Sequence, residues 1–310
     1  MASSAFGQTE NEPSVIDPTL LSRNPGTFED LNKKTKDLYP IIFEGFKFTL
    51  NKVISTHFQI NHNIILSSVV PSGYKFGATY VGVNQISASE VYPIVLGDMD
   101  SNGNLNTNII HQFHPNVRTR VVAQIADGIL AGYQMTNDYK GNDFTASITA
   151  VNSDIIQNSG VLIGHYLQRV SKNLDLGCEL LVQYGRNVPN NRMALYSVGW
   201  RYFGNMWQFS GVVNPLGSLH LCYYHQSKSP LQFGVELETN LRTMESSSSF
   251  SYQVDLSKAN MTFKGMVDSN WTAGAVLEKR LLPLPFTFVL SGFLNHVKAS
   301  YKFGIGFTIG

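Results

Sequence analysis

Hydrophobic and polar residues alternate through most of this 310-residue chain, and this period of two constrains the fold more than any other feature. The ranges 46–51, 58–66, 232–238, 250–256 and 301–309 all follow it. Successive side chains of a β-strand point to opposite faces, so the pattern predicts strands with one apolar and one polar face. Counted between turn signals, about nineteen strands of roughly ten residues each fit between residues 41 and 310.

Turn sequences separate the alternating runs. An Asn-Gly pair suits a two-residue hairpin because both residues tolerate a positive φ. The pattern predicts turns at Asn102-Gly103, Lys140-Gly141-Asn142, Asn187 to Asn191, Asn214-Pro215 and Ser246 to Ser249. The strand region holds no helical pattern, and this excludes an architecture built from βαβ units.

The N-terminal part of the chain does not alternate. Residues 1–24 are polar and contain two prolines, which predicts a disordered arm. Residues 25–40 predict a helix from Phe28 to Tyr39, since Thr27 and Asp30 approximate a capping box and Pro40 ends the helix. The expected apolar stripe, with spacings of three and four, consists of Phe28, Leu31, Thr35 and Leu38. Residues 41–310 are the predicted strand domain.

Composition narrows the classes of protein that fit. Only 15% of the residues are charged, against about 25% in a typical soluble domain. The net charge is +1 and 43% of the residues are hydrophobic, which argues against a disordered chain and against a strongly basic nucleic-acid-binding surface. Two cysteines are too few for a disulfide scaffold. No apolar run reaches the length of about 20 residues that a transmembrane helix needs, and the N-terminus does not resemble a secretory signal.

Two β architectures fit the alternation. A soluble sandwich turns its apolar faces inward, whereas a membrane barrel turns them toward lipid and lines a water-filled lumen with the polar faces. Low charge, abundant Tyr and Phe, and strands near the about 9–11 residues that cross a bilayer favour the barrel. We therefore predict an all-β transmembrane β-barrel of about 19 strands with an aqueous channel. An odd strand number without an export signal favours a eukaryotic organelle. A soluble β-rich binding protein or enzyme is the alternative.

Several motifs resemble one known family. They are Asn24 to Glu29, Gly45 to Lys52, Gly97 to Asp100, His165 to Gln168, Lys264 to Trp271 and Gly306 to Gly310. Through them the chain resembles the channel-forming subunits of the mitochondrial outer-membrane protein import translocase, in the eukaryotic porin superfamily. The voltage-dependent anion channels, metabolite pores of the same architecture, are the alternative, although their characteristic Gly-Leu-Lys tripeptide occurs nowhere in this chain.

The resemblance implies a multi-pass barrel of the mitochondrial outer membrane that passes unfolded, presequence-bearing precursor proteins. It places the N-terminal helix inside the lumen. The implied partners are precursor proteins, the central receptor and the small single-helix subunits of the translocase, a second copy of the barrel, and membrane lipid. A passive pore needs no catalytic group, so we expect no enzymatic activity, cofactor, metal site or nucleic-acid partner. The scattered histidines are expected to be structural, and Cys178 and Cys222 to be free thiols.

A channel for cationic presequences needs weak contacts at several places along its lumen. The acidic residues that strand alternation turns inward are the candidates: Asp175, Glu179, Glu236, Glu238, Asp255, Asp268 and Glu278. The last strand resembles the assembly signal of mitochondrial barrel proteins at Lys302, Gly304, Phe307 and Ile309. Trp271 opens a strand on the outward face, where we expect it to anchor at the membrane interface or to meet a partner helix.

Overall fold

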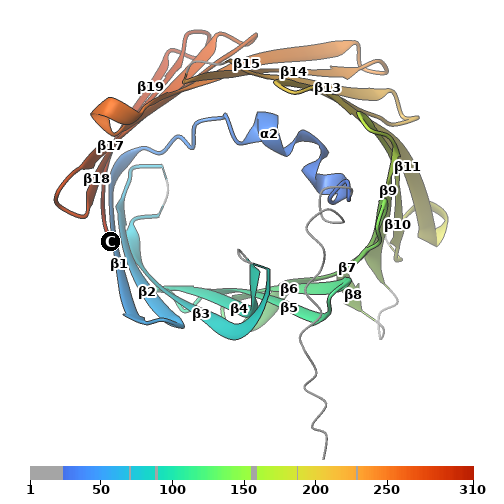
Figure 1. The fold of residues 1–310 in the computed structure, drawn as a ribbon, viewed down its shortest axis with the longest axis horizontal. Coiled ribbons are helices and arrows are strands. Elements are labelled where there is room, and N and C mark those ends of the chain that lie inside the picture. The colour runs from blue at the N-terminus through green and yellow to red at the C-terminus, as the bar shows by residue number, and fades with distance from the viewer. Residues whose placement is uncertain (1–23, 70, 88–89, 155–158, 187, 228–229) are drawn as a thin grey trace, which may run out of the picture.

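The computed structural model describes residues 24–310 apart from 70, 88–89, 155–158, 187 and 228–229. Nearly all of the predicted N-terminal arm therefore lies outside the described residues. Within the described part, nineteen strands form one sheet that closes on itself. Figure 1 shows the resulting ring, with the described N-terminal residues inside it. The predicted β-barrel and its strand number are both confirmed.

The strands follow one another around the ring in chain order. They are β1 Gly45–Ser55, β2 Phe58–Leu66, β3 Gly73–Ser87, β4 Glu90–Asp100, β5 Leu105–His114, β6 Val117–Ala126, β7 Ile129–Lys140, β8 Phe144–Asp154, β9 Ser159–Ser171, β10 Leu174–Tyr184, β11 Arg192–Phe203, β12 Trp207–Val213, β13 Ser218–Gln226, β14 Leu231–Asn240, β15 Glu245–Leu256, β16 Met261–Asp268, β17 Thr272–Leu281, β18 Phe286–Asn295 and β19 Ser300–Ile309.

The barrel closes through a parallel pair. Strands adjacent along the chain pair antiparallel, as β1 does with β2 and β18 with β19. An odd number of alternating strands brings the first and the last together in the same direction, and β1 pairs with β19 from Gly45 opposite Gly304 to Leu50 opposite Ile309. Closure leaves the sheet without an unpaired edge, which hydrocarbon surroundings do not tolerate.

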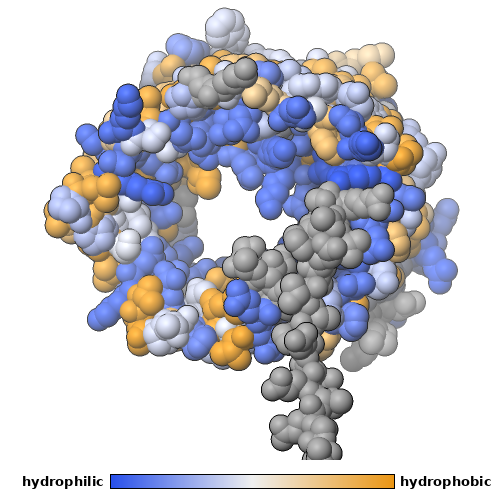
Figure 2. Space-filling view, in the orientation of Figure 1, coloured by the Kyte–Doolittle hydropathy of each residue, from blue (hydrophilic) through white to orange (hydrophobic). Residues whose placement is uncertain are grey.

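The two faces of the sheet differ as the barrel interpretation requires. Large apolar side chains point away from the axis and are exposed, including Ile148 (64%), Tyr196 (60%), Phe303 (61%) and Tyr301 (71%). In Figure 2 hydrophilic residues surround an open passage through the centre, while hydrophobic residues gather on the periphery. The apolar rows therefore do not form a dry centre, and the sandwich alternative is wrong.

The helical part of the N-terminal residues is shorter than predicted. A 3₁₀ helix, η1 (Phe28–Asn32), leads into a single α-helical turn, α2 (Lys33–Lys36), so the predicted end at Tyr39 is wrong. Beyond Lys36 the chain continues as a turn, with backbone hydrogen bonds from Leu38 to Thr35 and from Tyr39 to Lys36, and the ammonium group of Lys264 binds the carbonyl oxygen of Asp37 at 2.7 Å. None of the helices in the described residues has the length and apolarity needed to span a bilayer.

One predicted turn is also wrong. Ser246 to Ser249 belong to β15, and the turn lies at residues 241–244, where Met244 has a φ of 57°. Each of these serines pairs with a residue of β14, so the sheet context overrides the weak turn preference of serine. Two short 3₁₀ turns, η2 (Pro189–Asn191) and η3 (Ser257–Ala259), connect strands at the barrel ends.

Candidate functional site: the lumen and its internal segment

The first described residues lie along the inner surface of the barrel, and we call Asn24–Phe43 the internal segment (Figure 1). Asn24 fixes its start to the wall. The Asn24 side-chain amide donates a hydrogen bond to the carbonyl oxygen of Gly141 at 2.7 Å and accepts one from the Thr145 hydroxyl at 3.0 Å. The segment therefore begins on β8 and the turn before it.

The first helical turn packs its apolar face against β9 and its neighbours. Phe28 and Leu31 are 8% and 1% exposed and form a cluster with Leu167 of β9. The Phe28 ring stacks on the imidazole of His165, with centroids 5.3 Å apart. Thr35 and Leu38 are buried as well, so the predicted apolar stripe is confirmed.

The predicted capping box is present around Thr27. The Asp30 carboxylate accepts hydrogen bonds from the Thr27 hydroxyl at 2.7 Å and from the Thr27 backbone N–H at 3.4 Å. Burial by itself raises the pKa of Asp30, but these hydrogen bonds and the positive charge of Lys33 outweigh it. The pKa of Asp30 therefore lies below its ordinary value, and the carboxylate is charged at neutral pH.

Polar wall residues bind the backbone and side chains of the next turn. On β12, Gln208 Nε2 donates to the Leu31 carbonyl oxygen at 2.8 Å and the Ser210 hydroxyl donates to Asn32 Oδ1 at 2.7 Å. Asn32 Nδ2 also lies 3.1 Å from Nδ1 of His220 on β13. Asn32 is only 6% exposed, so its amide is a buried polar link between the segment and two strands.

The last part of the internal segment continues along the wall toward β19. Tyr39 and Ser249 form a hydrogen bond through their hydroxyl groups, and burial raises the pKa of Tyr39, which keeps the phenol protonated. The Phe43 backbone N–H donates to the Ser291 hydroxyl at 3.1 Å. The Phe43 carbonyl oxygen and ring then lie directly over Gly304. The segment thus follows the wall from β8 to β19.

Glycines mark the path of the internal segment on the wall. A Cβ atom at any of these positions would come within 3.0 Å of a segment atom: Gly177, Gly199, Gly234, Gly274 and Gly304. These close contacts let the segment lie flat against the sheet and leave the centre of the lumen open (Figure 2). This path was not predicted, although the sequence carries a signal for it in the glycines that recur on the inward face of several strands.

Of the seven predicted lumen acids, Asp175 is the most buried. It is 0% exposed and binds two arginines, Arg169 Nε at 2.8 Å and Arg201 Nε at 2.9 Å. Arg201 also donates a hydrogen bond to the Pro25 carbonyl oxygen. Asp175 therefore neutralises Arg169 and Arg201, the second of which binds the internal segment, and its carboxylate offers no surface to a polypeptide in the lumen.

Glu179 and Glu236 each face a histidine. Glu179 Oε2 lies 2.9 Å from His165 Nε2, and its other oxygen accepts a hydrogen bond from Ser197 at 3.2 Å. Glu236 is hydrogen-bonded to Nε2 of His220. Both glutamate side chains are partly exposed, at 27% and 15%, so each is bound to the wall and can also be reached from the lumen.

The remaining four predicted acids lie on neighbouring strands; Glu238 and Glu278 are exposed, and Asp255 and Asp268 are half-buried. Ser249 pairs with Glu236 on one side and with Asp268 on the other. Thr262 pairs with Asp255 and with Glu278 in the same way. Glu238, whose side chain is 65% exposed, lies two residues beyond Glu236. The structure thus brings five of the seven acids into the sector β14–β17: Glu236, Glu238, Asp255, Asp268 and Glu278.

This sector has an excess of negative charge on its inner face. Besides those five acids, Glu245 shares the inward alternation of β15. Among the described residues of β14–β17, the inward-facing cations are Lys264 and Arg280, and Lys264 is bound to the internal segment. The acidic character is therefore local, because acids and bases nearly balance over the whole chain.

Three further inward acids were missed by the sequence analysis. Asp98 and Asp100 lie on β4, and Asp138 lies on β7 with its carboxylate bound to Arg118 Nη2 at 2.7 Å. Asp98 and Asp100 belong to the Gly97 to Asp100 motif, and the alternation of that motif could have shown that both carboxylates point inward. All three lie on the side of the barrel away from β14–β17.

The other predicted site residues lie at the barrel seam and at one rim. Gly304, Phe307 and Ile309 pair with Gly45, Phe48 and Leu50 of β1. Lys302 faces the lumen, with Nζ 3.6 Å from a Glu44 carboxylate oxygen. Trp271 lies in the turn before β17 and does not open the strand itself; it is 69% exposed and has a φ of 54°.

These features define a class of protein: a membrane β-barrel pore with an apolar exterior, a polar lumen and an ordered segment inside it. The family model described as eukaryotic porin matches residues 24–304. The chain is 46% identical to the mitochondrial import receptor subunit TOM40 homolog of Bos taurus, over 93% of this chain and 78% of that protein. The homolog of Caenorhabditis elegans is 43% identical over 97% of this chain and 99% of its own length.

The relative in Homo sapiens, also a mitochondrial import receptor subunit TOM40 homolog, is 45% identical over 93% of this chain and 78% of that protein. The chain therefore belongs to the eukaryotic porin family and, within it, to the TOM40 homologs. Members of this family are channels, and the chain is not an enzyme.

Proposed function

We propose that this protein is the protein-conducting channel of the mitochondrial outer membrane, through which unfolded, presequence-bearing precursors pass. The observation that carries the proposal is an open passage lined by hydrophilic residues, in a chain about 45% identical to mitochondrial import receptor subunits. The apolar outer face fits a lipid bilayer. The barrel is the pore of the import complex, and its main role is protein import and not metabolite exchange.

We propose the sector β14–β17 as the part of the lumen that holds presequences. Its exposed acids, Glu238 and Glu278, and its half-buried acids, Asp255 and Asp268, attract a cationic helix, and Glu236 contributes less because a histidine binds it. Glu179, on β10 outside this sector, is also bound by a histidine and contributes less. Exposed ion pairs are each worth about 0–1 kcal/mol, so contacts at several positions hold a chain weakly enough for it to leave again. Asp175 has no part in this track because it is buried.

The outer surface is where we propose that the remaining partners of the complex bind. We propose that the apolar exterior contacts the helix of the central receptor, the small single-helix subunits, a second barrel and lipid. Trp271, exposed in the turn before β17, is proposed to anchor one rim at the membrane interface. Purification in mild detergent tests the assembly, since the helical subunits should accompany the barrel.

Site-specific photo-crosslinking of an arrested precursor tests the presequence track. Crosslinkers at Glu238, Asp255 and Glu278 should each give a product with the precursor, whereas the outward-facing neighbours Leu237, Val254 and Leu277 should give none. Reconstituted channels should prefer cations and be blocked by presequence peptide. Anion preference with closure under voltage would instead support a metabolite pore and overturn the import function.

A further inference from the structure

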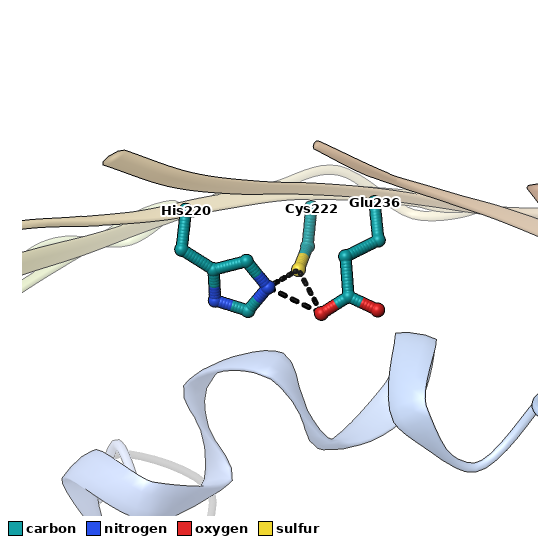
Figure 3. A group of neighbouring side chains, drawn as sticks. All are labelled: His220, Cys222 and Glu236. Atoms are coloured by element: carbon teal, nitrogen blue, oxygen red, sulfur yellow. Dashed lines mark hydrogen bonds and ion pairs between the residues drawn. The ribbon is translucent and has the colours of Figure 1, made fainter. Parts of the chain in front are cut away.

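Three side chains that can bind a metal ion converge on the inner wall under the internal segment. His220 and Cys222 lie two residues apart on β13, so both face inward, and Glu236 is the residue of β14 that pairs with Cys222. Figure 3 shows the imidazole, the thiol and the carboxylate directed at one another, with α2 on the lumen side. Their ligand atoms all lie within 4.8 Å of one another.

The spacing of these atoms is close to that of a tetrahedral zinc site. Zinc bonds of about 2.3 Å to sulfur and 2.0–2.1 Å to nitrogen hold the two ligand atoms about 3.5 Å apart. His220 Nε2 and Cys222 Sγ are 3.5 Å apart, and Sγ lies 3.9 Å from Glu236 Oε1. His220 and Glu236 are hydrogen-bonded directly, so the flexible glutamate side chain has to turn aside by a small amount as an ion enters.

We propose that His220, Cys222 and Glu236 form a binding site for a divalent transition-metal ion, with Zn²⁺ as the occupant. A thiolate and an imidazole select zinc over Mg²⁺ or Ca²⁺, which prefer oxygen ligands. On binding, the Cys222 thiol loses its proton to solvent, and the His220 proton moves from Nε2 to Nδ1. Three protein ligands leave a fourth position for water or for Glu238, whose Oε1 lies 3.7 Å from His220 Nε2.

The internal segment supplies the second shell of this site. A metal-bound imidazole needs a partner for its other nitrogen, and Asn32 is within 3.1 Å of His220 Nδ1. With Nδ1 protonated, the Asn32 amide turns over and presents its oxygen, while its NH₂ group donates to Ser210, whose hydroxyl accepts as readily as it donates. Both hydrogen bonds therefore survive, and the ion ties β13 and β14 to η1 through Asn32.

Charge and access also suit a cation. The Cys222 thiolate, Glu236 and Glu238 bring three negative charges, and Lys36 of α2 lines the same cavity as His220 and returns one positive charge. A divalent ion thus balances the group. His220 lines this cavity of about 290 Å³ and also one of about 970 Å³ that Glu238 shares, and these provide a route from the lumen to the imidazole.

Cobalt titration of the full-length barrel in detergent, after treatment with a chelator, tests the proposal. Co²⁺ should bind with one-to-one stoichiometry and give the near-ultraviolet absorption of a cobalt–thiolate bond. Cys222→Ser should abolish this band and Cys178→Ser, which removes the other cysteine, should leave it intact. Asn32→Ala should weaken binding by about 10–100-fold, the usual effect of losing a second-shell partner.

A second measurement keeps all three proposed ligands, so its result does not depend on whether a ligand variant folds. In the Cys178→Ser background, Zn²⁺ should slow alkylation of Cys222, and Mg²⁺ should not. Equal alkylation with and without Zn²⁺, or a cobalt band that persists in Cys222→Ser, would overturn the proposed site. Loss of the band in Cys222→Ser together with zinc protection of the thiol would support it.

Discussion

The Phe28 ring stacks on the imidazole of His165, with centroids 5.3 Å apart and planes inclined by 16°. This contact places the first turn of the internal segment on β9, and the same histidine holds Glu179 through its Nε2 atom. One wall residue thus joins the apolar attachment of the segment to the polar lining of the lumen. The segment's position is fixed by packing as well as by hydrogen bonds.

Replacing Phe28 by alanine should release the first turn of the segment. Truncating a buried Phe costs about 3–5 kcal/mol, and each 1.4 kcal/mol changes a population tenfold. Trypsin cleavage at Lys33, Lys34 and Lys36 should therefore speed up by about a hundredfold or more when opening precedes cleavage. Glu29→Ala, at the exposed neighbouring position, should leave the rate unchanged. Equal rates for both variants would mean that the ring does not hold the segment.

Asp175→Asn should destabilise the barrel without removing an accessible lumen charge. Arg169 and Arg201, whose side chains are 17% and 12% exposed, would then lose the buried carboxylate that they share, and breaking a buried ion pair typically costs about 3–5 kcal/mol. Urea unfolding in detergent, followed by the gel mobility of the folded barrel, measures the loss. The control is Glu278→Gln at an exposed wall position, which should stay within about 0.5 kcal/mol of the unmodified protein.

Neutralising the acidic sector should change ion selectivity and not stability. The triple variant Glu238→Gln, Asp255→Asn and Glu278→Gln removes three accessible negative charges while keeping side-chain size. Reversal potentials in planar bilayers should move toward zero, and presequence peptide should block at higher concentration. Asp98→Asn and Asp100→Asn, on the opposite wall, form the matched comparison. If these two substitutions weaken presequence block as much as the triple variant does, presequences are not held preferentially at the β14–β17 sector.

Gly304→Ala should impair closure of the barrel. A Cβ at this position would overlap the Phe43 carbonyl oxygen and ring, just where β1 begins to pair with β19. Less protein should then resist alkaline extraction from membranes. Gly292→Ala on the adjoining strand meets no atom within 4 Å and should assemble normally.

The closure defect can be separated from loss of the proposed assembly signal. A peptide of residues 300–310 contains Lys302, Gly304, Phe307 and Ile309 but cannot contact Phe43. If these residues act as the signal, the peptide should bind the assembly machinery and its Gly304→Ala form should not. Equal binding of both peptides would assign Gly304 to closure alone.

Acid should loosen the start of the internal segment through Asp30. The pKa of Asp30 is lowered in the folded protein, so its stabilising contribution is complete above the ordinary pKa of 3.8 and is lost as the pH falls through the lowered value. Protection of the segment from an acid-active protease should decrease in that range. Asp30→Asn should remove this pH dependence, and Glu29→Gln should preserve it. Persistence of the acid transition in Asp30→Asn would assign it to another group.

The strands and their two faces could be predicted because alternation is a local property of the sequence. Phe250, Tyr252 and Val254 face outward as their pattern indicates. The strand conformation of Ser246 to Ser249 could not be predicted in this way, since serine has only a weak local preference and the pairing of these residues with β14 decides their structure. The wall residue that binds the backbone just past the helix end, Lys264, is likewise remote in sequence.

The sequence could predict which side chains of the candidate site point into the lumen, but not which residues they contact there. Alternation turned all seven acids inward, and pairing between strands then decided their environments. Asp175 meets Arg201 directly across β10 and β11, which no local pattern reveals. The His220 and Cys222 pair was visible as a spacing of two on one strand, yet the third ligand comes from the register of β14. The sequence predicted structural histidines and free thiols separately, without bringing His220, Cys222 and Glu236 together.

The seam between β1 and β19 joins the first barrel strand to leave the ribosome with the last. No intermediate length of nascent chain can therefore satisfy both sheet margins, however far its hairpins have formed. Contacts between such distant parts of a chain also form slowly, because the entropy of bringing them together is lost first. Until β19 has been synthesised, both sheet margins stay unpaired and the barrel cannot close.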